Sequence, residues 1–489
     1  MLLSDILKDI DHTCADFRDG EIEDIVYDSR KAKPGTLFVA LRGAFSDGHD
    51  FAESAYFNGA RYFLAEHALS LPENAVTVIA ADTRAALSVI SAAFFGHPEK
   101  QLQVIGVTGT KGKTTVTHML RHCLDAVGIP SGVIGTVGAY YGDKYVPTVN
   151  TTPESYETLK LMRQMADAGI KAVCMEVSSL GLKHHRVDSI RFQEAVFTNL
   201  SPDHIGGAEH ESFAEYVYWK TQLFAQCDRA VLCADQPYSE EIKKKLTVPC
   251  TDFAVHAPAY VRAENISQLR GSNFFGVGFT CFAGAEQTQV RVSMPGLFSV
   301  ENALACIAVC MDMGVKPEQV AAALATVRVK GRNDCIPVEA DYDVVIDYAH
   351  NGQSFRSVIE TFAAYDHARI ITVFGSVGDR AQLRRREMGL VSGSLADLSI
   401  LTTDDPGFEE PESICADIAA AVKEAGGRYE IIPDRAEAVS HALTIAQKDD
   451  IVLLLGKGHE TAQKICGKKV PYSDYETVDA FFRDRERRT

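Results

Sequence analysis

Short apolar runs alternate with amphipathic stretches along most of the chain. In residues 1–98 the runs "TLFVAL" and "AVTVIA" flank a helical stretch near residues 51–59. The runs "VIGV", "KAVCMEV", "EAVFTNL" and "RAVLCA" follow, and each is too short for a helix, so they predict buried strands. Around residues 261–292 the pattern becomes β-rich, and "SVENALACIAVCMDMG" then predicts a helix that ends at Gly314.

The alternation is most regular from about residue 329 onward. The runs "YDVVIDYAH", "RIITVFG", "LSILTTDD", "YEIIP" and "DIVLLLGKG" predict strands, and helical stretches such as "SFRSVIETFAAY" separate them. Such alternation predicts parallel sheets with helices on both faces. We therefore expect an α/β fold with three regions that differ in pattern, residues 1–98, 99–328 and 329–489.

Composition narrows the class of protein. The chain has 489 residues and a net charge of −17, which weighs against wrapping nucleic acid or lying on anionic lipid. Its 12 cysteines include no CxxC pair, so we expect buried thiols and no disulfide framework. No apolar stretch approaches the ~18 residues of a membrane span. A cytoplasmic protein without membrane insertion is expected.

The stretch "VTGTKGKTTV" is the strongest chemical signal. It contains a shortened Walker A pattern, with glycines at 109 and 112 followed by Lys113 and Thr114. The glycines allow consecutive N–H groups to cradle phosphate, and the next helix adds the partial positive charge of its N-terminus. Lys113 would reach the β and γ phosphates and Thr114 would ligate Mg²⁺. The predicted ATP-binding residues of this loop are Gly109, Thr110, Lys111, Gly112, Lys113, Thr114 and Thr115.

A phosphate loop alone does not name a reaction. The chain lacks the Asn-Lys-x-Asp device for guanine selection. On this motif alone, kinases and mechanical ATPases stay open.

Further motifs follow the loop in a fixed order. They are "NTTP" (150–153), "MEVSSLGLKHHRV" (175–187), "FTNLSPDH" (197–204), "VVIDYAHN" (344–351) and "GKGHE" (456–460). With "GTKGKTT" they closely resemble the Mur ligases of peptidoglycan synthesis. "YDSRKAKPGTLFVALRGAFSDGHDF" and "DRAEAV" resemble the members that add the third residue of the stem peptide.

The resemblance implies an N-terminal UDP-binding domain, a central ATPase domain and a C-terminal Rossmann-like domain. It also implies that ATP phosphorylates the free carboxylate of UDP-N-acetylmuramoyl-L-alanyl-D-glutamate, and that the amine of a free amino acid attacks the acyl phosphate. The expected partners are therefore this UDP-linked dipeptide and an amino acid, and we expect a monomer.

Transfer of phosphate to a carboxylate gathers negative charges that metal ions must neutralise. The resemblance implies two Mg²⁺ ions, held by Thr114, Glu176 at a predicted strand end, and His204 after another. Lys220 in "YVYWKTQLF" matches the carbamylated lysine of the family, whose carbamate oxygens suit Mg²⁺. Lys113, Glu176, His204 and Lys220 are the expected catalytic residues. Alone, Glu176 or His204 would more often be an ordinary hydrogen-bonded residue, and Lys220 a solvated cation.

The resemblance also carries substrate residues over, one by one. For the UDP-linked substrate these are Ser29, Asn150, Thr151, Thr152, Ser178, His184 and Arg186. His184 stands where the family often has glutamine. The histidine keeps a hydrogen-bond donor at this position, but its protonation would depend on pH. Further nucleotide contacts are Asn302, Arg332, Asp347 and His350. For the amino acid they are Arg385, Asp404, Asp405, Gly456 and Glu460.

The loop "TTDDPGFEEP" bears on which amino acid is added. Family members that add meso-diaminopimelate typically carry Asp-Asn-Pro-Arg here, whereas this chain has Asp404, Asp405, Pro406 and Gly407. An acidic pocket without that guanidinium is expected to favour L-lysine or ornithine, although Arg384 or Arg386 could replace the arginine. Glu409 and Glu410 are expected to form a solvated turn.

Two alternatives remain beside this ligase. Folylpolyglutamate synthetase shares the chemistry, but it resembles only the last two domains. A non-catalytic binding homologue would keep the fold, yet the presence of Lys113, Thr114, Glu176, His204, Lys220 and His350 argues against it.

Overall fold

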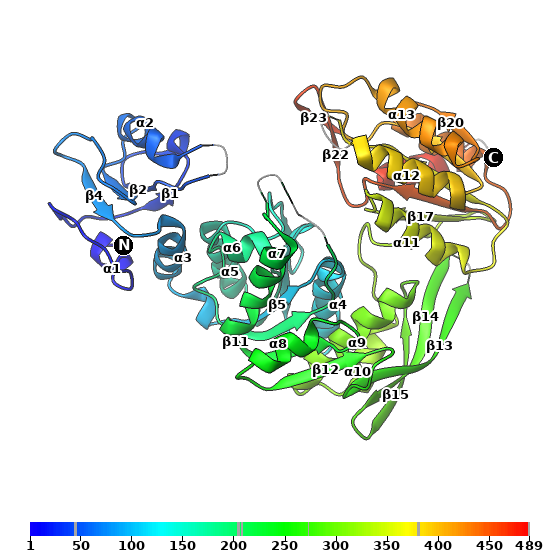
Figure 1. The fold of residues 1–489 in the computed structure, drawn as a ribbon, viewed down its shortest axis with the longest axis horizontal. Coiled ribbons are helices and arrows are strands. Elements are labelled where there is room, and N and C mark those ends of the chain that lie inside the picture. The colour runs from blue at the N-terminus through cyan, green and yellow to red at the C-terminus, as the bar shows by residue number, and fades with distance from the viewer. Residues whose placement is uncertain (44–45, 203–205, 207–208, 272, 379–381, 488–489) are drawn as a thin grey trace. The chain divides into compact units, whose positions relative to one another are not determined.

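The computed structural model describes residues 1–43, 46–202, 206, 209–271, 273–378 and 382–487. The chain divides into two compact units: Met1–Arg262 with Leu304–Val320, and Ala263–Ala303 with Ala321–Thr489. Strands and helices alternate through both, as Figure 1 shows. The expected α/β class is therefore confirmed. No helix in the described ranges is long and apolar enough to cross a membrane.

A four-stranded parallel sheet begins the first unit. Its order is β1 (Asp24–Val26), β2 (Thr36–Val39), β3 (Tyr62–Ala65) and β4 (Val76–Ile79). The helices around it are α1 (Leu3–Ile6), α2 (Ala52–Phe57) and α3 (Thr83–Phe94), with the 3₁₀ turns η1 (Ser29–Lys31), η2 (Gly48–Phe51) and η3 (Pro98–Lys100). Neighbouring residues of β2 enter different cores, because strand side chains alternate in direction: Leu37 packs with α1 and α3, and Phe38 with α2.

The second sheet of this unit carries the phosphate loop. The strands of this sheet that lie within the first unit have the hydrogen-bonded order β12 (Cys250–Ala254), β11 (Cys227–Cys233), β10 (Phe192–Phe197), β5 (Gln103–Thr108), β9 (Ala172–Glu176), β6 (Ser131–Gly135), β7 (Gly138–Tyr141) and β8 (Lys144–Val146). The strands from β12 to β6 are parallel, whereas β7 and β8 are antiparallel. The accompanying helices are α4 (Lys113–Ala126), α5 (Ser155–Asp167), α6 (Ser179–Lys183), α7 (Phe213–Thr221), η4 (Gln222–Gln226) and α8 (Ser239–Lys245).

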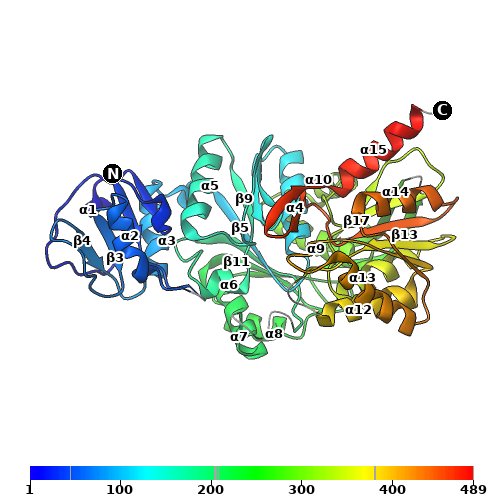
Figure 2. The same cartoon turned by 90° about the horizontal axis from the view of Figure 1, so that it is seen from above.

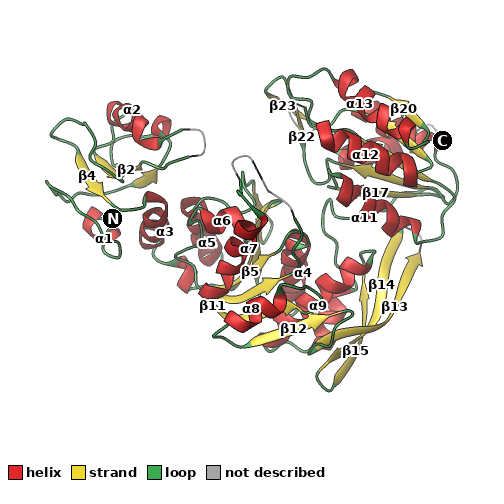
Figure 3. Cartoon of the chain, in the orientation of Figure 1, coloured by secondary structure: helices red, strands yellow, loops and turns green. Residues whose placement is uncertain are grey.

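Three long strands lie at the start of the second unit and are visible in Figure 3. They are β13 (Val261–Gly271), β14 (Phe274–Ala283) and β15 (Glu286–Val292), of which β14 and β15 pair in antiparallel fashion. The predicted helix follows as α9 (Leu297–Asp312), and Gly314 lies just beyond its end at φ +82°. The helix α10 (Pro317–Leu324) comes next.

The C-terminal sheet is the one that the sequence predicts most clearly. Its order is β16 (Asp334–Ile336), β17 (Asp343–Asp347), β21 (Ile451–Leu455), β18 (Ile370–Phe374), β19 (Leu398–Leu401) and β20 (Tyr429–Ile431). The helices are α11 (Gly352–Ala363), α12 (Gln382–Leu395), α13 (Pro411–Glu424), α14 (Arg435–Ile445) and α15 (Asp474–Glu486). Val345 packs with α11, α12 and α13, and its neighbour Ile346 with α14 and α15. Figure 2 shows these two helix layers on opposite sides of β17.

Two features differ from the sequence pattern. The antiparallel strands β7 and β8 extend the parallel sheet, and the hairpin β22 (Ala462–Ile465) with β23 (Lys468–Pro471) follows "GKGHE". All four residues of β23 are exposed, so no apolar alternation marks this strand.

Candidate active site

The phosphate loop lies where three parallel strands end together. Val107 of β5 pairs with Glu176 of β9, and Thr108 pairs with Phe197 of β10. The carboxyl ends of parallel strands meet at one edge of a sheet, where α/β proteins bind ligands. The predicted loop, Glu176 and the segment after β10 are therefore brought together.

Backbone geometry explains the first glycine of the loop. Gly109 has φ +151°, and a Cβ there would lie 2.0 Å from Thr198 Oγ1. The segment after β10 holds the loop: the Thr110 and Lys111 amides donate to the carbonyl and side-chain oxygens of Asn199 at 3.0 and 2.9 Å. Sequence reasoning missed Thr198 and Asn199 as loop supports, although both lie in the motif "FTNLSPDH".

Lys113 begins helix α4, directly after Gly112 at φ +85°. Its Nζ donates to the carbonyl oxygens of Gly109 at 2.8 Å and Thr110 at 3.1 Å. The ammonium therefore lies over the loop, beside backbone amides at a helix N-terminus. This arrangement suits a bound polyphosphate.

Glu176 is buried and surrounded by hydroxyl donors. Thr114 Oγ1 donates to both of its carboxylate oxygens at 3.0 Å. Thr136, which sequence reasoning missed, donates its amide at 2.8 Å and its hydroxyl at 3.1 Å. A carboxylate and a hydroxyl at this spacing are hard oxygen ligands of the kind that Mg²⁺ prefers, so Thr114 and Glu176 fit the expected ion.

Lys220 is buried beside the phosphate loop. It lies on α7 with Nζ 2.8 Å from the Gly109 carbonyl oxygen and 4.6 Å from the centroid of the Tyr216 ring. It is 2% exposed, so a solvated surface lysine is excluded. His204 lies outside the described residues.

The residues expected to hold the muramoyl peptide cluster at the end of β9. Thr152 Oγ1 donates to the Glu176 carbonyl at 2.9 Å and accepts from the Ser178 amide at 2.9 Å. Thr151 Oγ1 lies 3.0 Å from Thr136 Oγ1. Arg186 donates to the Thr152 carbonyl at 3.0 Å.

The remaining residues expected to bind the UDP-linked substrate are more scattered. Asn150 is exposed and Ser29 is buried in η1, where its carbonyl accepts from Asn58. Burial, with the charges of Arg84 and Arg186, lowers the pKa of His184 to about 4. This histidine is therefore neutral near pH 7, and its titration lies below the physiological range.

In the second unit, three expected nucleotide contacts share one region. Asp347 ends β17 and accepts from the amides of Asn333 and Ala349, each at 2.7 Å, and burial raises its pKa. The Arg332 guanidinium lies 5.3 Å from the centroid of the Tyr348 ring, and His350 Nδ1 lies 2.8 Å from the Tyr348 carbonyl oxygen. Asn302 is buried on α9.

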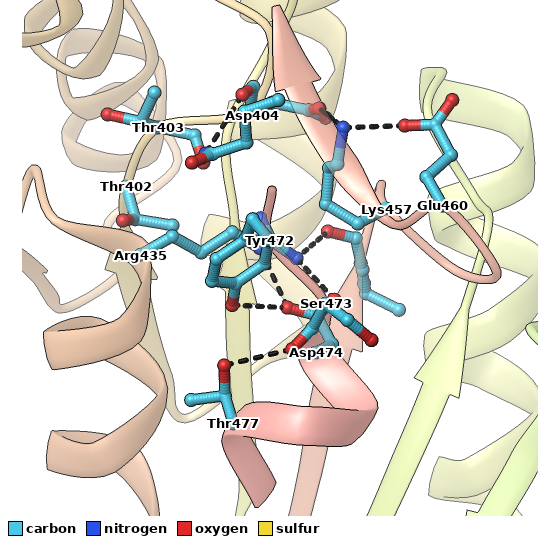
Figure 4. Close-up of polar contacts among 12 residues, drawn as sticks. Thr402, Thr403, Asp404, Arg435, Lys457, Glu460, Tyr472, Ser473, Asp474 and Thr477 are labelled. Carbon is cyan, nitrogen blue, oxygen red and sulfur yellow. Dashed lines mark hydrogen bonds and ion pairs between the residues drawn. The ribbon is translucent and has the colours of Figure 1, made fainter. Parts of the chain in front are cut away.

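Four of the five expected amino-acid residues, Asp404, Asp405, Gly456 and Glu460, meet at the ends of β19 and β21, and a lysine that the sequence did not single out joins them. Lys457 Nζ lies 3.5 Å from Asp404 and 2.5 Å from Glu460 (Figure 4). It also lies 2.8 Å from Asp405. Gly456 has φ +104°, and a Cβ there would lie 2.7 Å from Asp404 Oδ2. The expected acidic pocket thus contains its own ammonium.

Arg385 and Glu409 differ from expectation. Arg385 is 2% exposed and pairs with Glu409 at 2.8 Å and Asp417 at 2.9 Å, so its charge is met within the protein. Glu409 lies in a turn and its side chain is 35% exposed, as expected, but the sequence did not predict its pairing with the guanidinium that α12 brings to it. Arg386 pairs with Glu424, whereas Arg384 is exposed and has no ion pair with any described residue.

Comparison with known proteins identifies the family to which this chain belongs. Three family models match: "Mur ligase family, catalytic domain" over residues 21–111, "Mur ligase middle domain" over 107–310 and "Mur ligase, glutamate ligase domain" over 331–458. The chain belongs to the Mur ligase family. It is an ATP-dependent ligase with the three-domain α/β architecture of Mur ligases.

Mur ligase relatives match along the whole chain. The UDP-N-acetylmuramoyl-L-alanyl-D-glutamate--2,6-diaminopimelate ligase of Caldanaerobacter subterraneus subsp. tengcongensis is 39% identical, with 100% of both chains covered. That of Clostridium botulinum is 33% identical over 99% of this chain and 100% of its own. A solved structure of a ligase with this name has a TM-score of 0.68 at 26% identity and covers 95% of both chains.

Proposed function

We propose that this Mur ligase joins a diamino acid to UDP-N-acetylmuramoyl-L-alanyl-D-glutamate, forming a peptide bond, ADP and phosphate. The observation that carries the proposal is the full-length similarity to ligases named for this dipeptide. Folylpolyglutamate synthase structures share the fold over only 76% of the chain at 17% identity, so they give no competing support.

Within the proposed reaction, the phosphate loop binds the ATP phosphates and Lys113 offsets their charge. Its ammonium already lies against the loop carbonyls, so little reorganisation is needed when phosphate binds. The dipeptide carboxylate takes the γ phosphate to form an acyl phosphate, and the amine of the amino acid displaces phosphate from it. Asn302, Arg332, Asp347 and His350 remain the proposed contacts to the rest of the nucleotide.

Thr114 and Glu176 would hold Mg²⁺, and His204 and a carbamylated Lys220 would hold a second ion. Bound there, the ions would neutralise the charge that gathers during phosphate transfer. The buried position of Lys220 beside Gly109 supports a role at the phosphates. Carbamylation itself remains a proposal.

For the UDP-linked substrate we propose Ser29, Asn150, Thr151, Thr152, Ser178, His184 and Arg186. Thr152 supports this assignment most, because it joins the β9 end, which carries Glu176, to Ser178 and Arg186. The domain boundaries near residues 98 and 328 are proposed with it.

We propose 2,6-diaminopimelate as the amino acid. The names of the relatives support it, and so does Lys457, because an internal ammonium reduces the negative charge that would repel a second carboxylate. The sequence-based preference for lysine is not confirmed. Lysine stays a second candidate, because Gly407 stands where the family typically has the arginine that grips a second carboxylate. Gly407 has φ +62°, a backbone conformation that favours glycine over arginine.

The test is phosphate release from ATP with UDP-N-acetylmuramoyl-L-alanyl-D-glutamate and one amino acid at a time. Release that needs both the dipeptide and 2,6-diaminopimelate supports the proposal. Higher kcat/KM with lysine or ornithine would reverse the choice of amino acid. No release with any amino acid would contradict the ligase assignment itself.

A further inference from the structure

Lys457 is a buried ammonium enclosed by carboxylates from two loops. Its side chain is 0% exposed, and Asp404 and Asp405 come from the loop after β19, whereas Glu460 comes from its own loop after β21. Oxygen atoms of the three acids lie within 4.8 Å of one another. Like charges this close repel strongly, so a cation among them is needed.

The charges do not cancel. Three carboxylates face one ammonium, and Glu460 is 32% exposed, so an incoming ammonium can reach it. Burial alone would lower the pKa of Lys457, but Asp404, Glu460 and Asp405 raise it above its usual value. Lys457 therefore stays charged at neutral pH and sets how negative this site is.

Contacts other than Lys457 hold the two loops. Gln463 of β22 donates to the carbonyls of Thr403 at 3.2 Å and Asp404 at 3.0 Å. The Lys464 amide donates to Asp405 Oδ1 at 3.0 Å. Removing the Lys457 charge should therefore leave the Asp404–Asp405 loop in place.

A buried ion pair fixes the strand that leads to Lys457. Arg435 pairs with Asp474 at 2.9 Å, both side chains being 0% exposed, and donates to the Leu455 carbonyl at 3.0 Å. Tyr472 donates to Asp474 at 2.7 Å, as Figure 4 shows. The end of β21 is thus anchored independently, and Lys457 is free to act through its charge.

We propose that Lys457 is a specificity-determining residue, whose ammonium lets this site accept an amino acid with a second carboxylate although Gly407 supplies no guanidinium. The inference rests on the proposed amino-acid site. Lysine and 2,6-diaminopimelate both carry two amines and differ by one carboxylate. Extra negative charge at Asp404, Asp405 and Glu460 therefore weakens mainly the binding of 2,6-diaminopimelate, which carries the additional carboxylate.

Lys464 offers a matched control. Its Nζ lies 4.0 Å from Asp405 Oδ2, but its side chain is 67% exposed. Solvent screens such a charge, so its removal should matter little. Lys457→Met and Lys464→Met remove the same charge near the same carboxylate and differ in burial.

The experiment measures kcat/KM for 2,6-diaminopimelate and for L-lysine with the parent, Lys457→Met and Lys464→Met, alongside thermal unfolding. In Lys457→Met the kcat/KM for diaminopimelate, divided by the kcat/KM for lysine, should fall at least about tenfold. In Lys464→Met this ratio should stay within about twofold of the parent value. If Lys457→Met does not fold, Asp405→Asn provides the test: one fewer carboxylate should raise the ratio.

The possible outcomes distinguish a failure of the proposed function from a failure of the proposed role of Lys457. A parent enzyme inactive with every amino acid overturns the proposed function. An active parent with equal losses for both amino acids in Lys457→Met, or an unchanged ratio in Asp405→Asn, overturns the role of Lys457. A purely structural lysine would lower both values together and leave the ratio unchanged.

Discussion

Gly109→Ala tests whether the close contact between the phosphate loop and the segment after β10 matters for turnover. The new Cβ would lie 2.0 Å from Thr198 Oγ1, 3.1 Å from the Asn199 carbonyl oxygen and 3.2 Å from its amide nitrogen. The Thr198 hydroxyl must then move and lose its 2.7 Å bond to the Lys111 carbonyl. Asn199 has little freedom, because its carbonyl accepts from Thr110.

The magnitude follows from two costs. A non-glycine residue at φ +151° costs about 1–3 kcal/mol in backbone strain, and the lost hydrogen bond costs about 1 kcal/mol. If the loop shifts to relieve about 2–4 kcal/mol, kcat/KM for ATP should fall roughly 30-fold to 10³-fold.

Steady-state phosphate release and thermal unfolding measure the two consequences of Gly109→Ala. Gly128→Ala is the matched control, because Gly128 also has a positive φ of +83° but a Cβ there meets no atom within 4 Å. The control should lose some stability and keep its turnover. A Gly109→Ala enzyme within about threefold of the parent would refute the reasoning.

Three further changes have defined outcomes. Lys113→Ala should lower kcat by at least about 10²-fold, because the phosphates lose their nearest cation; near-normal turnover would contradict the phosphate-loop assignment. Lys220→Ala should stay folded but inactive, with acetate restoring part of the activity; a crystal structure with substrates and metals bound that shows a plain, solvent-facing Lys220 amine would argue against the carbamate. Burial raises the pKa of Glu194 from 4.5 to about 8. Between these values the folded state binds a proton that the unfolded state releases, and this proton binding stabilises the folded state. The stabilisation is lost as pH rises from about 5 to 8. Glu194→Gln should therefore gain Tm relative to the parent over that range, and an unchanged Tm difference from pH 5 to 8 would show that Glu194 does not titrate there.

The fold was largely predictable because its signals are local. The strand β5, the loop from Gly109 to Thr114 and helix α4 follow one another within about 25 residues, and each has its own pattern. The C-terminal strands are apolar on both faces, as buried parallel strands must be. The exposed strand β23 lacks such a pattern and was missed.

The candidate site was predictable only in part, because long-range pairing decides its electrostatics. Lys457 and Asp405 are 52 residues apart, and Arg385 and Glu409 are 24 apart, so no local pattern reports either contact. Reading Asp404 and Asp405 as an uncompensated acidic pocket overlooked Lys457, although the lysine stands in the quoted motif "GKGHE". Thr136 was missed because a threonine after a strand carries no chemical signature by itself.

The most direct measurement of the central claim is formation of the UDP-linked tripeptide, followed by mass spectrometry, with ATP, UDP-N-acetylmuramoyl-L-alanyl-D-glutamate and 2,6-diaminopimelate. The account predicts one tripeptide and one phosphate for each ATP consumed, and no product when the dipeptide, the amino acid or ATP is omitted. ATP hydrolysis without tripeptide for any diamino acid would contradict it.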